Sequence, residues 1–140
     1  MNREMQLIRA VALQADAISS EAEDFGRRAA GAITGDAGNR QIKGLESIAA
    51  SVRKVSDVLD YIKRHTAKCK KDESWRKGDF GVELLKFISE DLRRRCDDVA
   101  QQLGAAEAER QRISLLLIRE FVRQMAAHYA FVPLAEGERR

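Results

Sequence analysis

The sequence predicts an all-α protein, built as an antiparallel bundle of four long helices with a basic connector. Apolar residues recur at steps of three and four along most of the 140 residues, which is the period of amphipathic helices. One proline and nine glycines leave few interruptions, and runs of β-branched residues are rare. With 44% apolar and 34% charged residues, the composition is that of one globular domain, residues 1–140.

The most apolar stretch, residues 113–132, predicts the helix around which the others pack. Its apolar side chains form two rows, Ile113, Leu117, Phe121 and Met125 on one and Leu115, Ile118, Val122, Met125, Tyr129 and Val132 on the other. A helix that is apolar on two rows has neighbours on more than one side. Proline cannot continue the hydrogen-bond ladder, so we expect this helix (residues 107–132) to end before Pro133 and the tail (residues 133–140) to fray.

The first half of the chain predicts two further helices. Residues 3–33 carry a heptad seam of Ile8, Val11, Ala15, Ile18, Ala22, Phe25 and Ala29. Gly35 and Gly38 then allow a turn before the second helix, residues 40–66. The apolar stripe of that helix consists of Leu45, Ile48, Val52, Val55, Leu59 and Ile62. Seams of this length can also pair with another chain.

A connector without apolar period, residues 67–79, separates these helices from the rest. Trp75, the only tryptophan, stands among charges there. Two interpretations are open: the indole folds back as a plug over the end of the bundle, or it contacts a partner or stacks on a base. The third helix, residues 80–103, has one apolar face made of Phe80, Leu84, Phe87, Ile88, Leu92, Cys96, Val99 and Leu103. Gly104 permits the break before the last helix.

The net charge of +3 is concentrated in one segment. Residues 63–77 carry seven basic and two acidic groups, whereas the segments on either side are each slightly acidic. A local excess of this kind indicates an anion-facing surface, with nucleic acid as the first candidate. The residues expected to bind phosphates are Arg40, Lys43, Arg53, Lys54, Lys63, Arg64, Lys68, Lys70 and Lys71. The alternative is that these charges form an ordinary solvated face.

Known catalytic and metal-binding patterns are missing from the sequence. It has no Gly-rich phosphate loop, no zinc-ligand spacing, no HExxH and no nucleophile elbow, so we expect neither a cofactor nor a metal. No run of about 18 apolar residues predicts a membrane span, and the first residues do not form a signal peptide. Cys69 and Cys96 lack CxxC spacing and are expected to be reduced thiols in a cytoplasmic protein.

One weak catalytic pattern is present near the end of the last helix. Arg123 and His128 form R-x4-H, which resembles the motif of HEPN domains, helical bundles that often act as metal-independent ribonucleases. The resemblance implies an arginine that binds the scissile phosphate and a histidine that transfers or positions a proton. In a regular helix the two side chains are offset by about 140°, so they converge only across a dimer or a distorted turn. The alternative is an arginine on a polar stripe and a histidine at the edge of the bundle.

A second resemblance covers residues 34–132. The start of the second helix, Asn39-Arg40-Gln41-Ile42-Lys43, resembles the small all-helical subunit of type III CRISPR effector complexes and its type I relatives. The last helix of those subunits tends to carry an aromatic row that leads to Val-Ala-Tyr-His-like residues. The corresponding row here is Phe121, Met125, Ala127, His128, Tyr129 and Phe131. In place of an aromatic-Ala-Gly-Arg turn, the middle of this chain has the charged sequence SWRKGDFG.

This second resemblance implies a non-catalytic scaffolding function in RNA-guided antiviral defence. Several copies would self-associate by stacking within a larger protein complex and hold the guide RNA with its target, or a displaced strand, by backbone contacts. Two other functions are weighed against it. One is a helical adaptor that binds only protein, and the other is the HEPN-like ribonuclease that uses Arg123 and His128.

Overall fold

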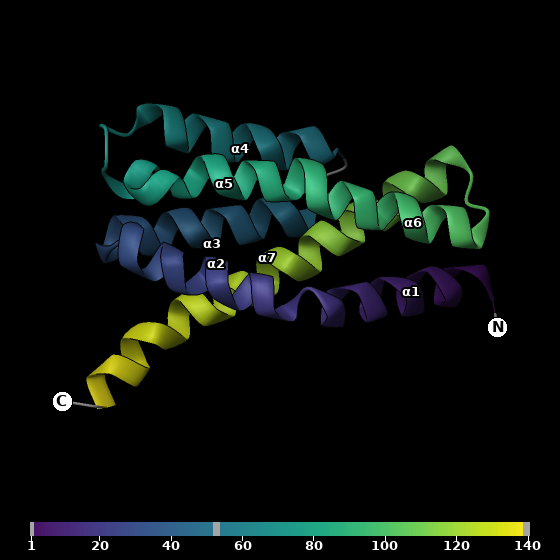
Figure 1. Cartoon of the computed structure of the whole chain (residues 1–140), viewed down its shortest axis with the longest axis horizontal. Coiled ribbons are helices and arrows are strands. Elements are labelled where there is room, and N and C mark those ends of the chain that lie inside the picture. Colours follow the sequence, from purple (N-terminus) through teal and green to yellow (C-terminus); the bar gives the residue numbers. More distant parts are fainter. Residues whose placement is uncertain (1, 52–53, 139–140) are drawn as a thin grey trace.

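The computed structural model describes residues 2–51 and 54–138, and it confirms the all-α class. Within these ranges the regular elements are all helices, and no strand occurs. Successive rods reverse their direction, and the last one crosses the others diagonally (Figure 1). The division of the chain into helices differs from the prediction at several points.

The first rod follows the predicted span but bends near its middle. It consists of α1 (Arg3–Ala17) and α2 (Ser19–Ala32), which meet at Ile18. Ile18 has φ −104° and ψ 12°, outside the helical region. The ladder nevertheless continues across the bend, because Ile18 N–H donates to Gln14 O at 3.1 Å and Ala22 N–H donates to Ile18 O at 3.0 Å. The predicted single helix is therefore one rod with a bend.

The predicted second helix, residues 40–66, is wrong as one element. The chain forms α3 (Gly35–Ser51) and α4 (Val55–Lys68), which run in opposite directions (Figure 1). Lys54 is extended, with φ −134° and ψ 132°, and residues 52–53 lie outside the described part. No glycine or proline marks this break, and the apolar stripe passes through it in phase. The turn expected at residues 34–39 is also shorter, since α3 already begins at Gly35.

The third predicted helix is correct in its bounds. It comprises α5 (Phe80–Lys86), a π-helical segment (Phe87–Leu92) and α6 (Arg93–Leu103), which follow one another without a break. The preceding connector folds into a 3₁₀ turn, Ser74–Asp79. Gly78 has φ 58° there, a left-handed conformation that glycine adopts without steric cost.

The last helix is central, as predicted, but it does not end at Pro133. The helix α7 (Glu107–Glu138) packs against α1, α2, α3, α4 and α6. It continues through Pro133, so the expected frayed tail is helical as far as Glu138. Phe131 and Leu134 are 61% and 67% exposed, which shows that α7 extends beyond the bundle at this point. Pro133 removes one hydrogen bond of the helical ladder there without ending the helix.

The core gathers around α7 and contains a cluster of aromatic rings. Phe25 of α2 lies with its ring centroid 6.3 Å from Phe80, 5.3 Å from Phe87 and 5.9 Å from Phe121. The buried residues of α7 are Ile113, Leu117, Ile118, Phe121, Val122, Met125, Ala126 and Tyr129. The Tyr129 hydroxyl donates to Ile33 O at 2.8 Å, which satisfies the polar group that accompanies this ring into the core.

The closest approach between α2 and α7 requires Gly26. A Cβ at this position would lie 2.5 Å from His128 Cβ and 2.7 Å from Met125 O, so Gly26→Ala forces the two helices apart. We expect the variant to lose about 1–3 kcal/mol in its free energy of unfolding, measured by urea denaturation. The control is Gly31→Ala in the same helix, where a Cβ meets nothing within 4 Å, and we expect a gain of about 0.5 kcal/mol. Equal effects in the two variants would contradict this packing.

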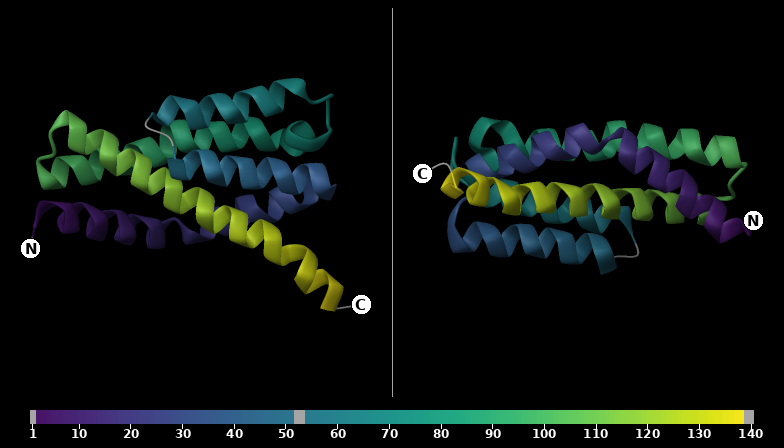
Figure 2. Two further views of the ribbon diagram at one scale, coloured as in Figure 1. Left: turned by 180° about the vertical axis from the view of Figure 1, so that it is seen from behind. Right: turned by 90° about the horizontal axis from the view of Figure 1, so that it is seen from below.

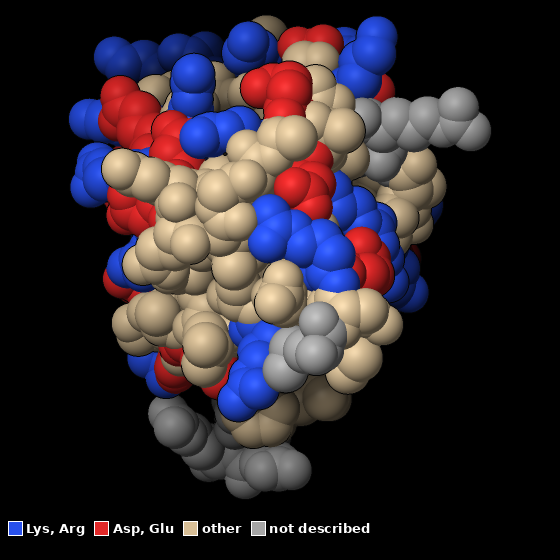
Figure 3. Space-filling view, turned by 90° about the vertical axis from the view of Figure 1, so that its right-hand side faces the viewer, with Lys and Arg blue, Asp and Glu red and all other residues tan. Residues whose placement is uncertain are grey.

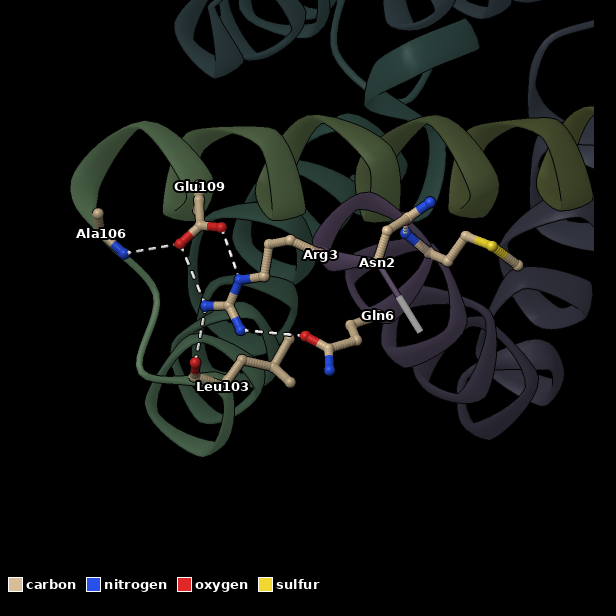
Figure 4. Close-up of polar contacts among 7 residues, drawn as sticks. Asn2, Arg3, Gln6, Leu103, Ala106 and Glu109 are labelled. Carbon is tan, nitrogen blue, oxygen red and sulfur yellow. Dashed lines mark hydrogen bonds and ion pairs between the residues drawn. The ribbon is translucent and has the colours of Figure 1, made fainter.

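The start of the chain is fastened to the turn between α6 and α7 (Figure 4). Arg3 Nε donates to Glu109 Oε2 at 2.7 Å, and its terminal nitrogen donates to Leu103 O, also at 2.7 Å. Glu109 Oε1 accepts from the Ala106 amide at 3.1 Å and so caps the start of α7. The hydrogen bond from Arg3 and that from the Ala106 amide lower the pKa of Glu109. One guanidinium thereby joins three helices.

Residues 2–51 and 54–138 contain no helix that is both long enough and apolar enough to cross a membrane.

Candidate nucleic-acid interface

The beginning of α3 is held beside the end of α4 by two aromatic side chains that bond to Gln41. The Tyr61 hydroxyl donates to Gln41 O at 2.6 Å, and the Trp75 indole N–H donates to Gln41 Oε1 at 2.7 Å. The Tyr61 hydroxyl also occupies the space that a side chain at Gly44 would take. These contacts fix the register of the two antiparallel helices at this end of the molecule.

Trp75 is the plug of this end, and it is fully buried, with 0% of its side chain exposed. His65 stacks on it with ring centroids 5.4 Å apart and an interplanar angle of 22°, and Phe80 lies 5.8 Å away. The interpretation of Trp75 as a structural plug is therefore confirmed, and the indole is not available for stacking on a base. Burial first, and then the charges of Lys68 and Arg64, lower the pKa of His65, which disfavours its charged form.

Several of the predicted phosphate-binding residues meet at this end. The register set by Tyr61 brings the first turns of α3 alongside the last turns of α4, and the connector begins there. We call the exposed group at this point the cationic end; its members are Arg40, Arg64, Lys68, Lys70 and Lys71. Their charges come from two helices and one loop, and the exposed acids Asp36, Asp72 and Glu73 belong to the same segments.

The other predicted residues stand apart from this group. Lys43 and Lys63 are exposed on α3 and α4 and lie on the flanks of the cationic end, turned away from the seam between the two helices. Lys54 is exposed at the opposite end of the α3–α4 pair, where α4 begins. Arg53 lies outside the described residues. Of the nine predicted phosphate-binding residues, five therefore belong to the cationic end and the others lie outside it.

Within the described ranges, the members of the cationic end lack partners of opposite charge, as do some exposed cations elsewhere, such as Lys54, Lys86 and Arg93. None of its five members has a carboxylate within 4.0 Å among the described residues. The ion pairs that are present elsewhere use Arg3, Arg27, Arg28, Arg94, Arg110, Arg112 and Arg123. Figure 3 shows the opposite end of the molecule, where basic and acidic side chains alternate around an uncharged area. Unneutralised cations favour binding of an external anion.

Two basic residues of the connector have positioning functions that the sequence did not indicate. Arg76 donates to Cys69 O at 3.2 Å, and Lys77 Nζ donates to Gly31 O at 3.1 Å. Arg28 of α2 pairs with Glu83 and also donates to Gly78 O. These contacts tie the loop to α2 and to the end of α4, and they join α2 to α5. They were not predictable, because their acceptors are mostly backbone carbonyls that no side-chain pattern reveals.

The structure does not bring Arg123 and His128 together within one chain. The exposed Arg123 donates to Glu120 Oε2 at 2.7 Å, one turn earlier on α7. His128 is half-buried where α7 packs against Gly26 of α2. Both residues lie on a regular helix, so their side chains keep the offset that the spacing predicts.

The two cysteines are free thiols with structural surroundings. Burial raises the pKa of Cys96 to about 11, so its thiol stays protonated. Cys69 donates to His65 O at 3.1 Å, at the end of α4. Within the described ranges, no group of three or more His, Cys, Asp or Glu side chains is placed to hold a metal ion.

No protein-family model matches the chain, and neither a curated protein nor a solved structure does.

Proposed function

We propose that this chain is a non-catalytic small subunit that holds a nucleic acid by its sugar–phosphate backbone at the cationic end. The observation that carries the proposal is the group of five exposed cations without described carboxylate partners, positioned by the buried contacts of Trp75 and Tyr61. Lysine and arginine bind phosphates without reading sequence, and all five members of the cationic end are exposed.

The aromatic residues near this surface support backbone contacts over base contacts. Single-strand binding proteins add affinity by stacking bases on exposed aromatic rings. Here Trp75 is buried, and Tyr61 is half-buried with its hydroxyl bonded to Gln41 and its ring packed against His65. The described residues of the cationic end thus offer charge but no free aromatic face. Binding is therefore expected to depend weakly on base composition.

The resemblance to the small subunit of CRISPR effector complexes gives this function a context. In that context the partners are the guide RNA with its target, or a displaced strand, and the other protein subunits of an RNA-guided complex. The resemblance and the cationic end share the start of α3. Arg40 is a member of the cationic end, and Gln41 accepts the hydrogen bonds from Tyr61 and Trp75 that position it.

The proposal is tested by titrating the chain with labelled single-stranded RNA and with an RNA–DNA duplex at several salt concentrations. We expect log K to fall with log salt with a slope of about −3 to −4 for the single strand, as for about five phosphate contacts. Affinity then drops about 100-fold between 50 and 200 mM salt. Absence of binding at the lower salt overturns the proposal and leaves the protein-binding adaptor.

The same samples test the ribonuclease alternative. We expect no RNA cleavage, because Arg123 and His128 do not converge on α7 and Arg123 is engaged by Glu120. Intact RNA after prolonged incubation, assayed on a denaturing gel, is the predicted result. Cleavage that disappears in both Arg123→Ala and His128→Ala would establish a nuclease in place of the proposed scaffold.

A further inference from the structure

Three large apolar side chains of α1 are exposed, although the opposite face of this helix packs into the core. Met5, Ile8 and Leu13 are 57%, 49% and 65% exposed, whereas Leu7 and Val11 are buried. The other large exposed apolar side chains of the described residues are Val82, Phe131 and Leu134, which lie on α5 and α7. In the views from the front and from behind, α1 runs along the edge of the molecule (Figures 1 and 2).

Four exposed residues of α1 lie in one row along the helix. Met5, Arg9, Ala12 and Asp16 follow one another at steps of four, three and four, so they form a single stripe. Ile8 and Leu13 lie on the two sides of this stripe. The four residues of the stripe are exposed in the structure. Apolar residues (Met5 and Ala12) alternate on this stripe with residues of opposite charge (Arg9 and Asp16).

The charges on this stripe are complementary to those of a second copy of the same helix. Arg9 and Asp16 have opposite charges, lie two turns apart, and take part in none of the described ion pairs. If two copies of α1 pack antiparallel about a two-fold axis between Ala12 and Leu13, each Arg9 faces Asp16 of the other copy. The pattern is thus self-complementary, which is the property that an isologous interface requires.

The surface beside α1 has a groove that can receive a side chain of a second, antiparallel α1 helix. A groove with a volume of about 360 Å³ runs between α1 and α7, and its lining combines apolar residues such as Ile8, Ala12 and Leu116 with the polar residues Asp16, Glu120, Arg123 and Gln124. The antiparallel register places Leu13 of the second copy opposite Ala12, at this groove. The small side chain of Ala12 at the axis also lets the two backbones approach closely.

We propose that the protein forms a dimer through α1, paired antiparallel with α1 of a second copy. The two cationic ends lie away from this axis, because they are formed by α3, α4 and the connector at the other end of the molecule (Figure 1). The dimer therefore presents two separate cationic ends. It does not rest on the nucleic-acid proposal, and either can fail alone.

The test is sedimentation equilibrium of the full chain over a wide range of concentration, without nucleic acid. We expect a monomer–dimer equilibrium, and we expect Arg9→Asp and Asp16→Arg each to raise its dissociation constant about tenfold or more, since each places like charges opposite one another twice. The double variant Arg9→Asp/Asp16→Arg restores dimerisation, because the two charges have exchanged places. Leu13→Glu abolishes the dimer and leaves the helical circular dichroism unchanged, since Leu13 has no part in the core.

The matched control is Lys86→Asp, which reverses an exposed cation on α5 and leaves the dissociation constant unchanged. A protein that is monomeric at every concentration overturns the proposal. A dimer that tolerates the single reversals, or that the double variant fails to restore, overturns the α1 register.

Discussion

Replacing Lys63, Arg64, Lys70 and Lys71 together by glutamate is expected to abolish RNA binding at about 150 mM salt, with an affinity lower by about 1000-fold or more. Three of the four belong to the cationic end, and Lys63 flanks it. All four are exposed, and none takes part in a described ion pair, so the substitutions remove phosphate contacts without disturbing the core. An electrophoretic mobility shift titration measures the loss.

A control variant with the same net charge shows whether RNA binding depends on the position of the charges or only on their total number. Lys54, Lys86, Arg93 and Arg119 are likewise exposed, lie outside the cationic end and take part in no described ion pair. Their combined replacement by glutamate changes the net charge by the same amount. We expect this variant to retain RNA binding within about tenfold of the parent, since only long-range attraction is weakened. If both variants lose binding equally, the nucleic acid has no preferred site at the cationic end.

Trp75→Ala is expected to cause the largest loss of stability, about 3–5 kcal/mol in the free energy of unfolding. The side chain is fully buried, packs against His65 and Phe80, and bonds to Gln41. For a chain of this size the loss corresponds to a melting temperature lower by about 10–20 °C, measured by calorimetry. RNA binding at temperatures below the transition also weakens, because the connector is no longer held over the bundle.

An exposed aromatic residue provides the comparison for Trp75. Phe131 on α7 is 61% exposed, and Phe131→Ala is expected to change the free energy of unfolding by less than about 0.5 kcal/mol. The free energy of unfolding of Trp75→Phe is expected to lie between those of Trp75→Ala and Phe131→Ala, since phenylalanine keeps most of the apolar contact and loses the hydrogen bond to Gln41. Indistinguishable stabilities of Trp75→Ala and Phe131→Ala would show that the plug does not hold the end of the bundle.

The sequence predicted those parts of the fold that depend on apolar period. The central position of residues 113–132 followed from two apolar rows, and the bounds of residues 80–103 followed from one. The break after Ser51 was not predictable in the same way, because the stripe from Leu45 to Ile62 keeps its phase across it. The helix end predicted at Pro133 was wrong although the sequence carries a clear stop signal there. Pro133 lies where α7 extends beyond the bundle, and it removes one hydrogen bond without ending the helix.

The sequence indicated the charges of the candidate site but not how the fold brings them together. The excess of charge in residues 63–77 was visible in composition alone. That Arg40 joins this segment while Lys54 does not depends on the reversal between α3 and α4, which a single long helix would not produce. The contacts of Gln41 with Tyr61 and Trp75 also join residues far apart in the chain, and no local pattern encodes them.

The most direct test of the cationic end is a lysine-acetylation footprint of the chain with and without bound RNA, read by mass spectrometry. The proposal predicts that RNA protects Lys68, Lys70 and Lys71, whereas Lys54 and Lys86 react at the same rate in both samples. Bound RNA that leaves these three lysines as reactive as before, or that protects Lys54 and Lys86 equally, would contradict it.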